Sequence, residues 1–82
     1  MVKAEFTKEF QAIFSKIKEE SAKLKIIKQI EKIKTNPEVG KPMRYNRNGT
    51  RELYIKPFRL SYIYSHETDT VRILDLYHKD EQ

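Results

Sequence analysis

The residues that could do chemistry gather between Lys41 and Tyr64 of this 82-residue chain. Aromatic side chains are interspersed there with six basic ones, and Glu52 is the single acid. The basic residues are Lys41, Arg44, Arg47, Arg51, Lys56 and Arg59, and the aromatic ones are Tyr45, Tyr54, Phe58, Tyr62 and Tyr64. Cations bind phosphates, and aromatic rings stack on bases. The pattern therefore favours RNA as the ligand.

RNA can be cleaved without a metal when its own 2′-OH attacks the neighbouring phosphate. A protein then supplies a base, cations for the charge on the phosphorane, and an acid for the departing 5′-oxygen. Arg59 is the strongest candidate for the cation, because it lies mid-strand on the face opposite Leu60 and Tyr62. The alternative has equal weight: Arg59 is structural, stacked on a tyrosine or paired with Glu52 or Asp75.

The other candidates have a functional and a structural reading. Arg51 and Lys56 flank the same hairpin and could reach a shared cleft, or they could be surface charge. His78 and Lys79 follow the last predicted strand, where His78 could exchange a proton near neutral pH or simply lie on the surface. Tyr77 could stack on a base or fill the edge of the core. The residues expected to bind the RNA chain are Arg44, Arg47, Tyr54 and Tyr77.

Composition limits the class of protein. The net charge of +5 and the pI near 9.5 favour a polyanion or an acidic protein as partner, with a solvated basic surface as the alternative. Nine of the twelve lysines precede residue 35, whereas all five arginines follow it. The chain has no cysteine and two histidines, so we expect no metal site and no cofactor. It has no apolar run typical of a membrane helix or signal peptide, which predicts a cytoplasmic protein.

The first half of the chain predicts a short strand over residues 2–6 and then two helices. Thr7 is the expected N-cap of the first helix, and Ser21 that of the second, over residues 22–34. The buried stripes recur at helical spacing, with Phe10, Ile13, Phe14 and Ile17 in the first and Ile26, Ile27, Ile30 and Ile33 in the second. Two helices so close in sequence are expected to pair as an antiparallel hairpin.

The second half has the two-residue period of strands. Strands are expected over residues 51–55, 58–64 and 71–77, with a further short segment possible at 43–45. The last strand is apolar on both faces, which indicates either a central position in the sheet or cover on both faces. The predicted fold is α+β: an N-terminal strand and an antiparallel helical hairpin packed on a small, mainly antiparallel β-sheet, as one domain over residues 1–82.

Three stretches together resemble the RelE/ParE toxin superfamily, and the archaeal RelE-like toxins in particular. They are residues 40–53, the strand Phe58-Arg59-Leu60-Ser61-Tyr62, and residues 73–80 with their closing His-Lys-Asp. The resemblance extends over the whole chain. It implies a type II toxin that enters the ribosomal A site and cleaves mRNA there, and that a RelB-like antitoxin neutralises. The chain is then a RelE-like toxin domain over residues 1–82.

The resemblance also implies roles for residues. Arg59 matches the family's strand arginine that stabilises the transition state, and Lys79 falls where many members have a second functional arginine. Arg51 and Lys56 lie in the segment where other members place catalytic lysines. Many RelE-like nucleases carry a tyrosine beyond this point, whereas this chain stops at Gln82, so either His78 or Tyr77 replaces it or the nuclease activity is weak or absent.

Two other functions stay open at this point. ParE-type toxins share the fold but poison DNA gyrase, and they usually lack the basic catalytic set. The arginines between residues 44 and 59 favour the RelE type. A basic RNA-binding module without catalysis is the third possibility, because no motif taken alone specifies cleavage.

Overall fold

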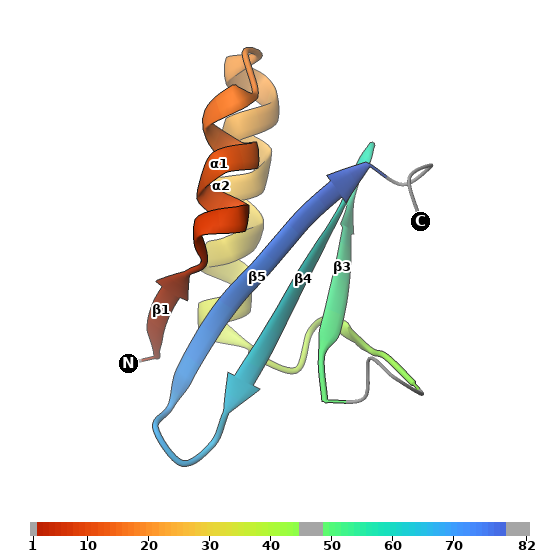
Figure 1. The fold of residues 1–82 in the computed structure, drawn as a ribbon. Coiled ribbons are helices and arrows are strands. Elements are labelled where there is room, and N and C mark those ends of the chain that lie inside the picture. The colour runs from red at the N-terminus through yellow and green to blue at the C-terminus, as the bar shows by residue number, and fades with distance from the viewer. Residues whose placement is uncertain (1, 45–48, 79–82) are drawn as a thin grey trace.

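The computed structural model describes residues 2–44 and 49–78. Within them it contains two helices and a five-stranded sheet (Figure 1). The elements are β1 (Lys3–Phe6), α1 (Lys8–Lys16), α2 (Glu20–Thr35), β2 (Lys41–Pro42), β3 (Arg51–Ile55), β4 (Phe58–Ser65) and β5 (Thr70–His78). The sheet order is β1-β5-β4-β3-β2, in which β1 pairs with β5 in parallel and the other pairs are antiparallel. This confirms the predicted α+β fold and the predicted inner position of the last strand.

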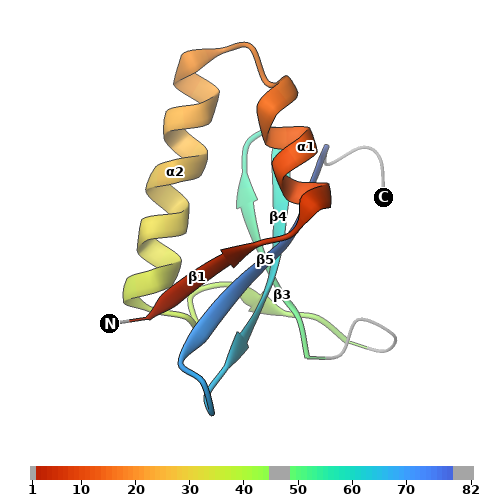
Figure 2. The same cartoon turned by 60° about the vertical axis from the view of Figure 1, so that its left-hand side comes forward.

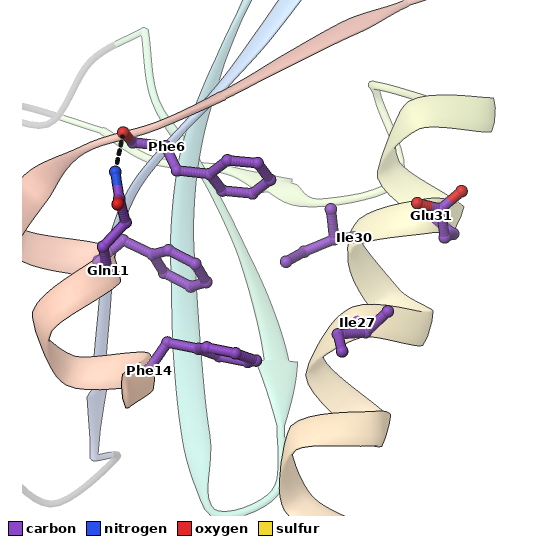
Figure 3. A pocket seen from close by; sticks show the side chains of 7 residues that line it. Phe6, Gln11, Phe14, Ile27, Ile30 and Glu31 are labelled. Atoms are coloured by element: carbon purple, nitrogen blue, oxygen red, sulfur yellow. Dashed lines mark hydrogen bonds between the residues drawn. The ribbon is translucent and has the colours of Figure 1, made fainter. Parts of the chain in front are cut away.

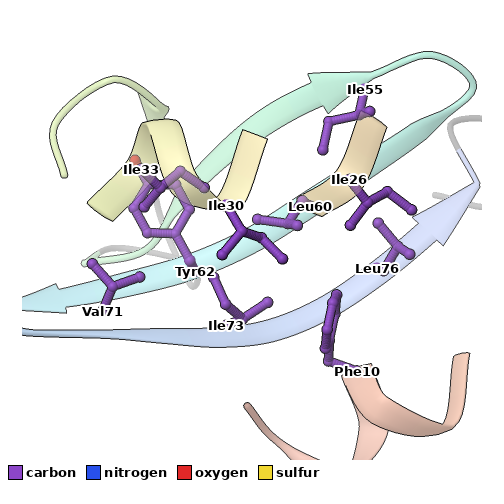
Figure 4. Packing of buried hydrophobic residues seen from close by; sticks show 10 residues of the cluster. All are labelled: Phe10, Ile26, Ile30, Ile33, Ile55, Leu60, Tyr62, Val71, Ile73 and Leu76. Atoms are coloured by element: carbon purple, nitrogen blue, oxygen red, sulfur yellow. The ribbon is translucent and has the colours of Figure 1, made fainter. Parts of the chain in front are cut away.

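Both helices lie against the same face of the sheet (Figures 1 and 2). One buried cluster joins them to it, because Phe10 of α1 and three isoleucines of α2 pack against β3, β4 and β5 (Figure 4). The cluster contains Phe10, Ile26, Ile30, Ile33, Ile55, Leu60, Tyr62, Val71, Ile73 and Leu76. Burial of these apolar side chains is the main force that holds the helices on the sheet. The other face of the sheet, which we call the open face, is turned away from this core.

The first helix begins as predicted. The Thr7 hydroxyl accepts a hydrogen bond from the Phe10 amide at 3.1 Å, which satisfies one of the otherwise unpaired amides of the first turn. The same hydroxyl donates to the Leu74 carbonyl of β5 at 2.6 Å. Thr7 therefore fixes the start of α1 to the last strand.

Three local expectations were wrong. Ser21 does not cap the second helix, because α2 starts at Glu20 with Glu19 at the N-cap and no capping side chain. The short extra strand is at Lys41–Pro42 rather than at 43–45, and Tyr45 of that segment lies outside the described residues. Ile27, expected in the core, has 46% of its surface exposed, because it borders a groove between the helices.

A β-bulge in β5 decides which side chains reach the open face. Ser61 and Tyr62 are adjacent in β4, but their partners in β5 are Asp75 and Ile73, so Leu74 is the extra residue. Before the bulge, Val71 and Ile73 face the core. After it the alternation is shifted by one residue, so that Leu76 is buried and Asp75 and Tyr77 face the other way.

Candidate functional site

The open face presents two rows of polar and aromatic side chains. The strand registers align Tyr54, Arg59 and Tyr77 in one row across β3, β4 and β5. The next row lies two residues away in each of the same strands and consists of Glu52, Ser61 and Asp75. Both rows alternate with residues of the buried cluster, so their side chains leave the sheet on the face away from the helices. Three predicted residues are thus together in the first row.

Arg59 lies between an aromatic ring and a carboxylate. Its guanidinium carbon is 5.9 Å from the centre of the Tyr54 ring, which is within the range of a cation–π contact. Its Nη1 is 3.6 Å from Oε1 of Glu52. One third of the Arg59 side chain (33%) remains exposed, whereas that of Glu52 is 4% exposed. Both structural partners that the sequence suggested for Arg59, a tyrosine and Glu52, are therefore present, and part of the arginine still faces solvent.

Glu52 links the two rows. The Tyr77 hydroxyl, reaching from β5, donates a hydrogen bond to Oε2 of Glu52 on β3. The other oxygen of the carboxylate, Oε1, is the one nearest Arg59. A charged group is rarely buried without such partners, because leaving water costs it several kcal/mol. Tyr77 and Arg59 are among the partners that permit this burial.

Carboxylates line the hollow beside Glu52. The hollow, of about 430 Å³, lies between the N-terminus of α1 and the open face, and Glu9, Glu52 and Asp75 border it. A row that is cationic and aromatic thus adjoins a hollow that is acidic. The acidic hollow repels a phosphate, whereas the β3–β4 turn lies on the other side of Arg59 along the strands. Lys56 lies exposed in that turn.

Arg51 is on the face opposite Arg59. It alternates with Leu53 and Ile55, and its Nη1 donates to the carbonyls of Gly40 at 2.7 Å and Glu38 at 3.1 Å. These carbonyls belong to the connection between α2 and β2, so Arg51 fastens that connection to β3. This position does not bring Arg51 together with Arg59.

Tyr62 also holds the connection between α2 and β2, by two hydrogen bonds. Its buried hydroxyl donates to the Pro37 carbonyl at 2.7 Å and accepts from the Gly40 amide at 2.8 Å. Burial raises the pKa of the Tyr62 hydroxyl, which keeps it protonated and able to donate. A Cβ on Gly40 would lie only 2.7 Å from the Tyr62 ring, so the close approach requires glycine there.

His78 is also separated from Arg59. It is the cross-strand partner of Phe58, and the two rings meet edge to face with centres 6.0 Å apart. Phe58 packs against the buried cluster, so His78 lies on the helix side of the sheet at its end. Tyr77, not His78, is the C-terminal candidate that shares a face with Arg59.

The remaining predicted residues are peripheral or outside the described part. Arg44 is exposed beside β2, where it borders a shallow surface depression with Lys41. Arg47 and Lys79 lie outside the described residues. Among the described residues, no group of three or more His, Cys, Asp or Glu side chains could hold a metal ion. No helix within residues 2–44 and 49–78 has the length and apolar character needed to cross a membrane.

A second surface feature is an apolar groove between the helices, of about 430 Å³ (Figure 3). Phe6 ends β1, and its ring stacks on Phe10, which stacks on Phe14 along α1. Ile27 and Ile30 of α2 form the opposite wall. Phe6 and Ile27 are 42% and 46% exposed, so the groove presents hydrophobic surface to solvent. Groups of exposed apolar side chains of this kind mark interaction sites.

Sequence reasoning missed Glu52 as a member of the site and missed the groove. The sequence shows Glu52 as the single acid in the basic stretch, but it suggested Glu52 only as a structural partner of Arg59. The groove has a weaker signal, because Phe6 and Ile27 fit the periodic pattern of buried positions. Whether these positions stay exposed depends on how far apart the two helices lie, which the sequence pattern does not show.

Comparison with known proteins agrees with this architecture. The sequence model of the family described as "ParE toxin of type II toxin-antitoxin system, parDE" matches residues 2–82. The chain belongs to this ParE toxin family. Membership confirms the RelE/ParE superfamily that the sequence motifs predicted, and it makes the chain a toxin of a type II toxin–antitoxin system. A comparison with curated proteins finds no similar sequence.

Solved structures share the fold of this ParE-family toxin over nearly the whole chain. The intact E. coli RelBE toxin–antitoxin complex matches with a TM-score of 0.82 at 13% identity, covering 100% of both chains. The archaeal RelE–RelB complex from Pyrococcus horikoshii gives 0.78 at 10% identity, covering 99% of this chain and 98% of the other. The RelBE2 complex from Mycobacterium tuberculosis gives 0.75 at 25% identity, covering 95% and 98%.

Proposed function

We propose that this toxin inhibits translation by cleaving mRNA in the ribosomal A site, through attack of the RNA's own 2′-OH on the adjacent phosphate. The observation that carries the proposal is the row Tyr54–Arg59–Tyr77 on the open face. It combines an arginine, which stabilises charge on a phosphorane, with tyrosines on which bases can stack. Lys56 and Arg44 would add phosphate contacts at the edge of this face.

The positions of the residues divide their proposed roles. Arg59 would stabilise the transition state, because it is always charged and fixed on a strand. Tyr77 would take the place of the C-terminal tyrosine of related nucleases, since it shares the open face with Arg59. Arg51 and His78 face the other way, so we propose a structural role for Arg51 and no direct role for His78. Lys79 keeps its proposed part as a second cation.

The experiment that tests this function is primer extension on mRNA bound to purified ribosomes. Discrete cleavage within A-site codons, lost in Arg59→Ala, is the expected result. Naked mRNA under the same conditions is the control and should stay intact. Cleavage that requires no ribosome, or no cleavage at all by the folded toxin, would contradict the proposal.

One observation favours a second function, inhibition of DNA gyrase. The buried Glu52 carboxylate neutralises Arg59, and two other predicted catalytic residues, Arg51 and His78, are on the opposite face of the sheet. A toxin that acts only by binding a protein needs no such assembly. Purified gyrase separates the two: loss of supercoiling with intact mRNA in the ribosome assay supports the gyrase function.

We also propose that a RelB-like antitoxin covers the apolar groove between α1 and α2. The RelBE and RelE–RelB structures above pair toxins of this fold with such partners. The groove offers Phe6, Phe14 and Ile27, and Lys23 lies over the Phe14 ring at 5.3 Å. An amphipathic helix with an apolar stripe and acidic flanks fits this combination. Its binding would bury surface that the toxin alone leaves in water.

A further inference from the structure

We propose that Glu52 determines which phosphates Arg59 can bind, because it is an internal competitor that a nucleic-acid phosphodiester has to displace. The class of ligand rests on the proposed function, whereas the competition rests on the geometry of the open face. The residues involved are Glu52, Arg59, Tyr77 and Tyr54.

Glu52 is held in a fixed position beside Arg59. Its side chain is 4% exposed, and the Tyr77 hydroxyl holds Oε2 from the far side of β4. Its backbone lies within β3, paired to Ser61 of β4. The negative charge next to Arg59 is therefore a fixed part of the site, and a ligand can compete with it only by drawing the arginine away.

Glu52 holds Arg59 by charge rather than by good hydrogen-bond geometry. The distance of 3.6 Å between Nη1 and Oε1 exceeds that of a charge-assisted hydrogen bond. Nε of Arg59 is buried, and no described residue accepts a hydrogen bond from it. A phosphate oxygen at hydrogen-bond distance offers the guanidinium a better acceptor than the one it has.

A phosphate binds at this site only if its ligand makes a further contact nearby. The Glu52–Arg59 pair has no net charge, so a bare phosphate gains little by approaching it. Tyr54, which is 50% exposed, has the centre of its ring 5.9 Å from the guanidinium carbon of Arg59. A nucleotide chain can stack a base on this ring while its phosphate engages the guanidinium. Glu52 thereby makes the site selective for nucleotide chains over simple anions.

Binding of a non-cleavable 2′-O-methyl oligoribonucleotide, followed by fluorescence anisotropy, tests the competition in a double-mutant cycle. The proteins are wild type, Glu52→Gln, Arg59→Ala and the double variant. Glu52→Gln should tighten binding by roughly three- to tenfold when Arg59 is present, and should have no such effect in the Arg59→Ala background. An equal gain in affinity in both backgrounds would mean that Glu52 acts only through the net charge of the protein. This result would overturn the inference.

Glu5→Gln is the matched control. It removes the same charge from another acid–arginine pair, because Oε1 of Glu5 lies 4.0 Å from Nε of Arg72 and both side chains are largely exposed. The change in net charge is identical, so it should alter affinity far less than Glu52→Gln. A gain in the Glu5→Gln variant as large as that in Glu52→Gln would also overturn the inference.

A second measurement needs no variant, in case Glu52→Gln folds poorly. In a ¹H–¹⁵N spectrum, the Nε–H signal of Arg59 in the wild-type toxin should shift with the oligonucleotide and stay in place with inorganic phosphate. Equal shifts with both ligands, or with neither, would overturn the proposed selectivity. The readouts do not involve cleavage, so an inactive toxin in the ribosome assay would remove the proposed function and leave this result standing.

Discussion

Arg59 and His78 lie on opposite faces of the sheet, although their strands are hydrogen-bonded neighbours. His78 is paired with Phe58, and Arg59 is paired with Tyr77. Neighbours along one strand point to opposite faces, so a ligand on Arg59 meets Tyr77 and not His78. A mechanism in which His78 acts as the acid on the same phosphate that Arg59 binds therefore does not fit the fold.

Substitution of Arg59 should slow mRNA cleavage in the ribosome assay. Arg59→Lys keeps the charge but loses the planar fork, and Arg59→Ala loses both, so the rate should fall in that order. The loss in Arg59→Ala should be on the order of a hundredfold, by analogy with removal of one oxyanion donor. Arg72→Ala removes a largely exposed arginine and should leave the rate unchanged. Cleavage at the wild-type rate by folded Arg59→Ala would assign Arg59 a structural role.

Tyr77 and His78 should differ in the same assay. Tyr77→Phe removes the hydroxyl that faces the site and holds Glu52, so cleavage should slow by roughly tenfold or more. His78→Ala changes the helix side of the sheet and should leave the rate nearly unchanged. Single-turnover cleavage rates at equal ribosome occupancy measure the difference. The reverse order of effects would exclude this role for Tyr77.

Arg51 should matter for stability more than for chemistry. Arg51→Ala leaves the carbonyls of Gly40 and Glu38 without their donor, and should lower the free energy of unfolding by about 1–3 kcal/mol. Lys56→Ala, at the exposed β3–β4 turn, is the control and should cost little. Urea unfolding followed by circular dichroism gives both values. Equal stability of the two variants would show that the connection does not depend on Arg51.

Tyr62 should make the toxin sensitive to alkaline pH. Burial raises the pKa of its hydroxyl above the unfolded value of about 10, so the folded state favours the neutral form. The resulting stability is fully present below that value and is lost as the pH rises through the higher folded value. Melting temperatures of wild type and Tyr62→Phe should therefore converge above about pH 10. A constant difference between them up to pH 11 (about one unit above the unfolded value) would contradict this.

Two substitutions in α2 test the groove. Ile27→Glu places a charge in its wall and should weaken binding of the antitoxin with little loss of stability, because Ile27 is already 46% exposed. Leu24→Glu is the matched control, since Leu24 is 62% exposed and is not among the residues that line the groove. Calorimetric titration with the antitoxin measures both affinities. If Leu24→Glu weakens binding as much, the partner covers a different part of α2.

The elements were predictable because their signals are local. The Thr7 cap, the buried stripe of α1 and the alternation of Phe58, Leu60 and Tyr62 each follow from neighbouring residues. The uncovered Ile27 was not predictable, since periodicity shows which side of a helix is apolar and not how near its neighbour lies. That residues 1–82 form one domain stays a prediction.

The assembly of the site was not predictable either, because it depends on the bulge at Leu74. Strict alternation from Val71 would put Tyr77 on the core side and His78 on the open face. One extra residue reverses this assignment. Its carbonyl is held by Thr7, which lies 67 positions earlier in the chain. No local pattern in the sequence indicates such a contact.

The parallel pairing of β1 with β5 also affects when the toxin can form during its synthesis. Lys3–Phe6 are synthesised before the residues with which they pair, Thr70–Ile73. A ribosome delivers the chain from its N-terminus, so β1 has no strand to pair with until the last strand is available. The open face and the groove beside Phe6 therefore take shape only after β5 has been made, and a nascent chain without β5 lacks both the complete arginine row and the surface proposed for the partner.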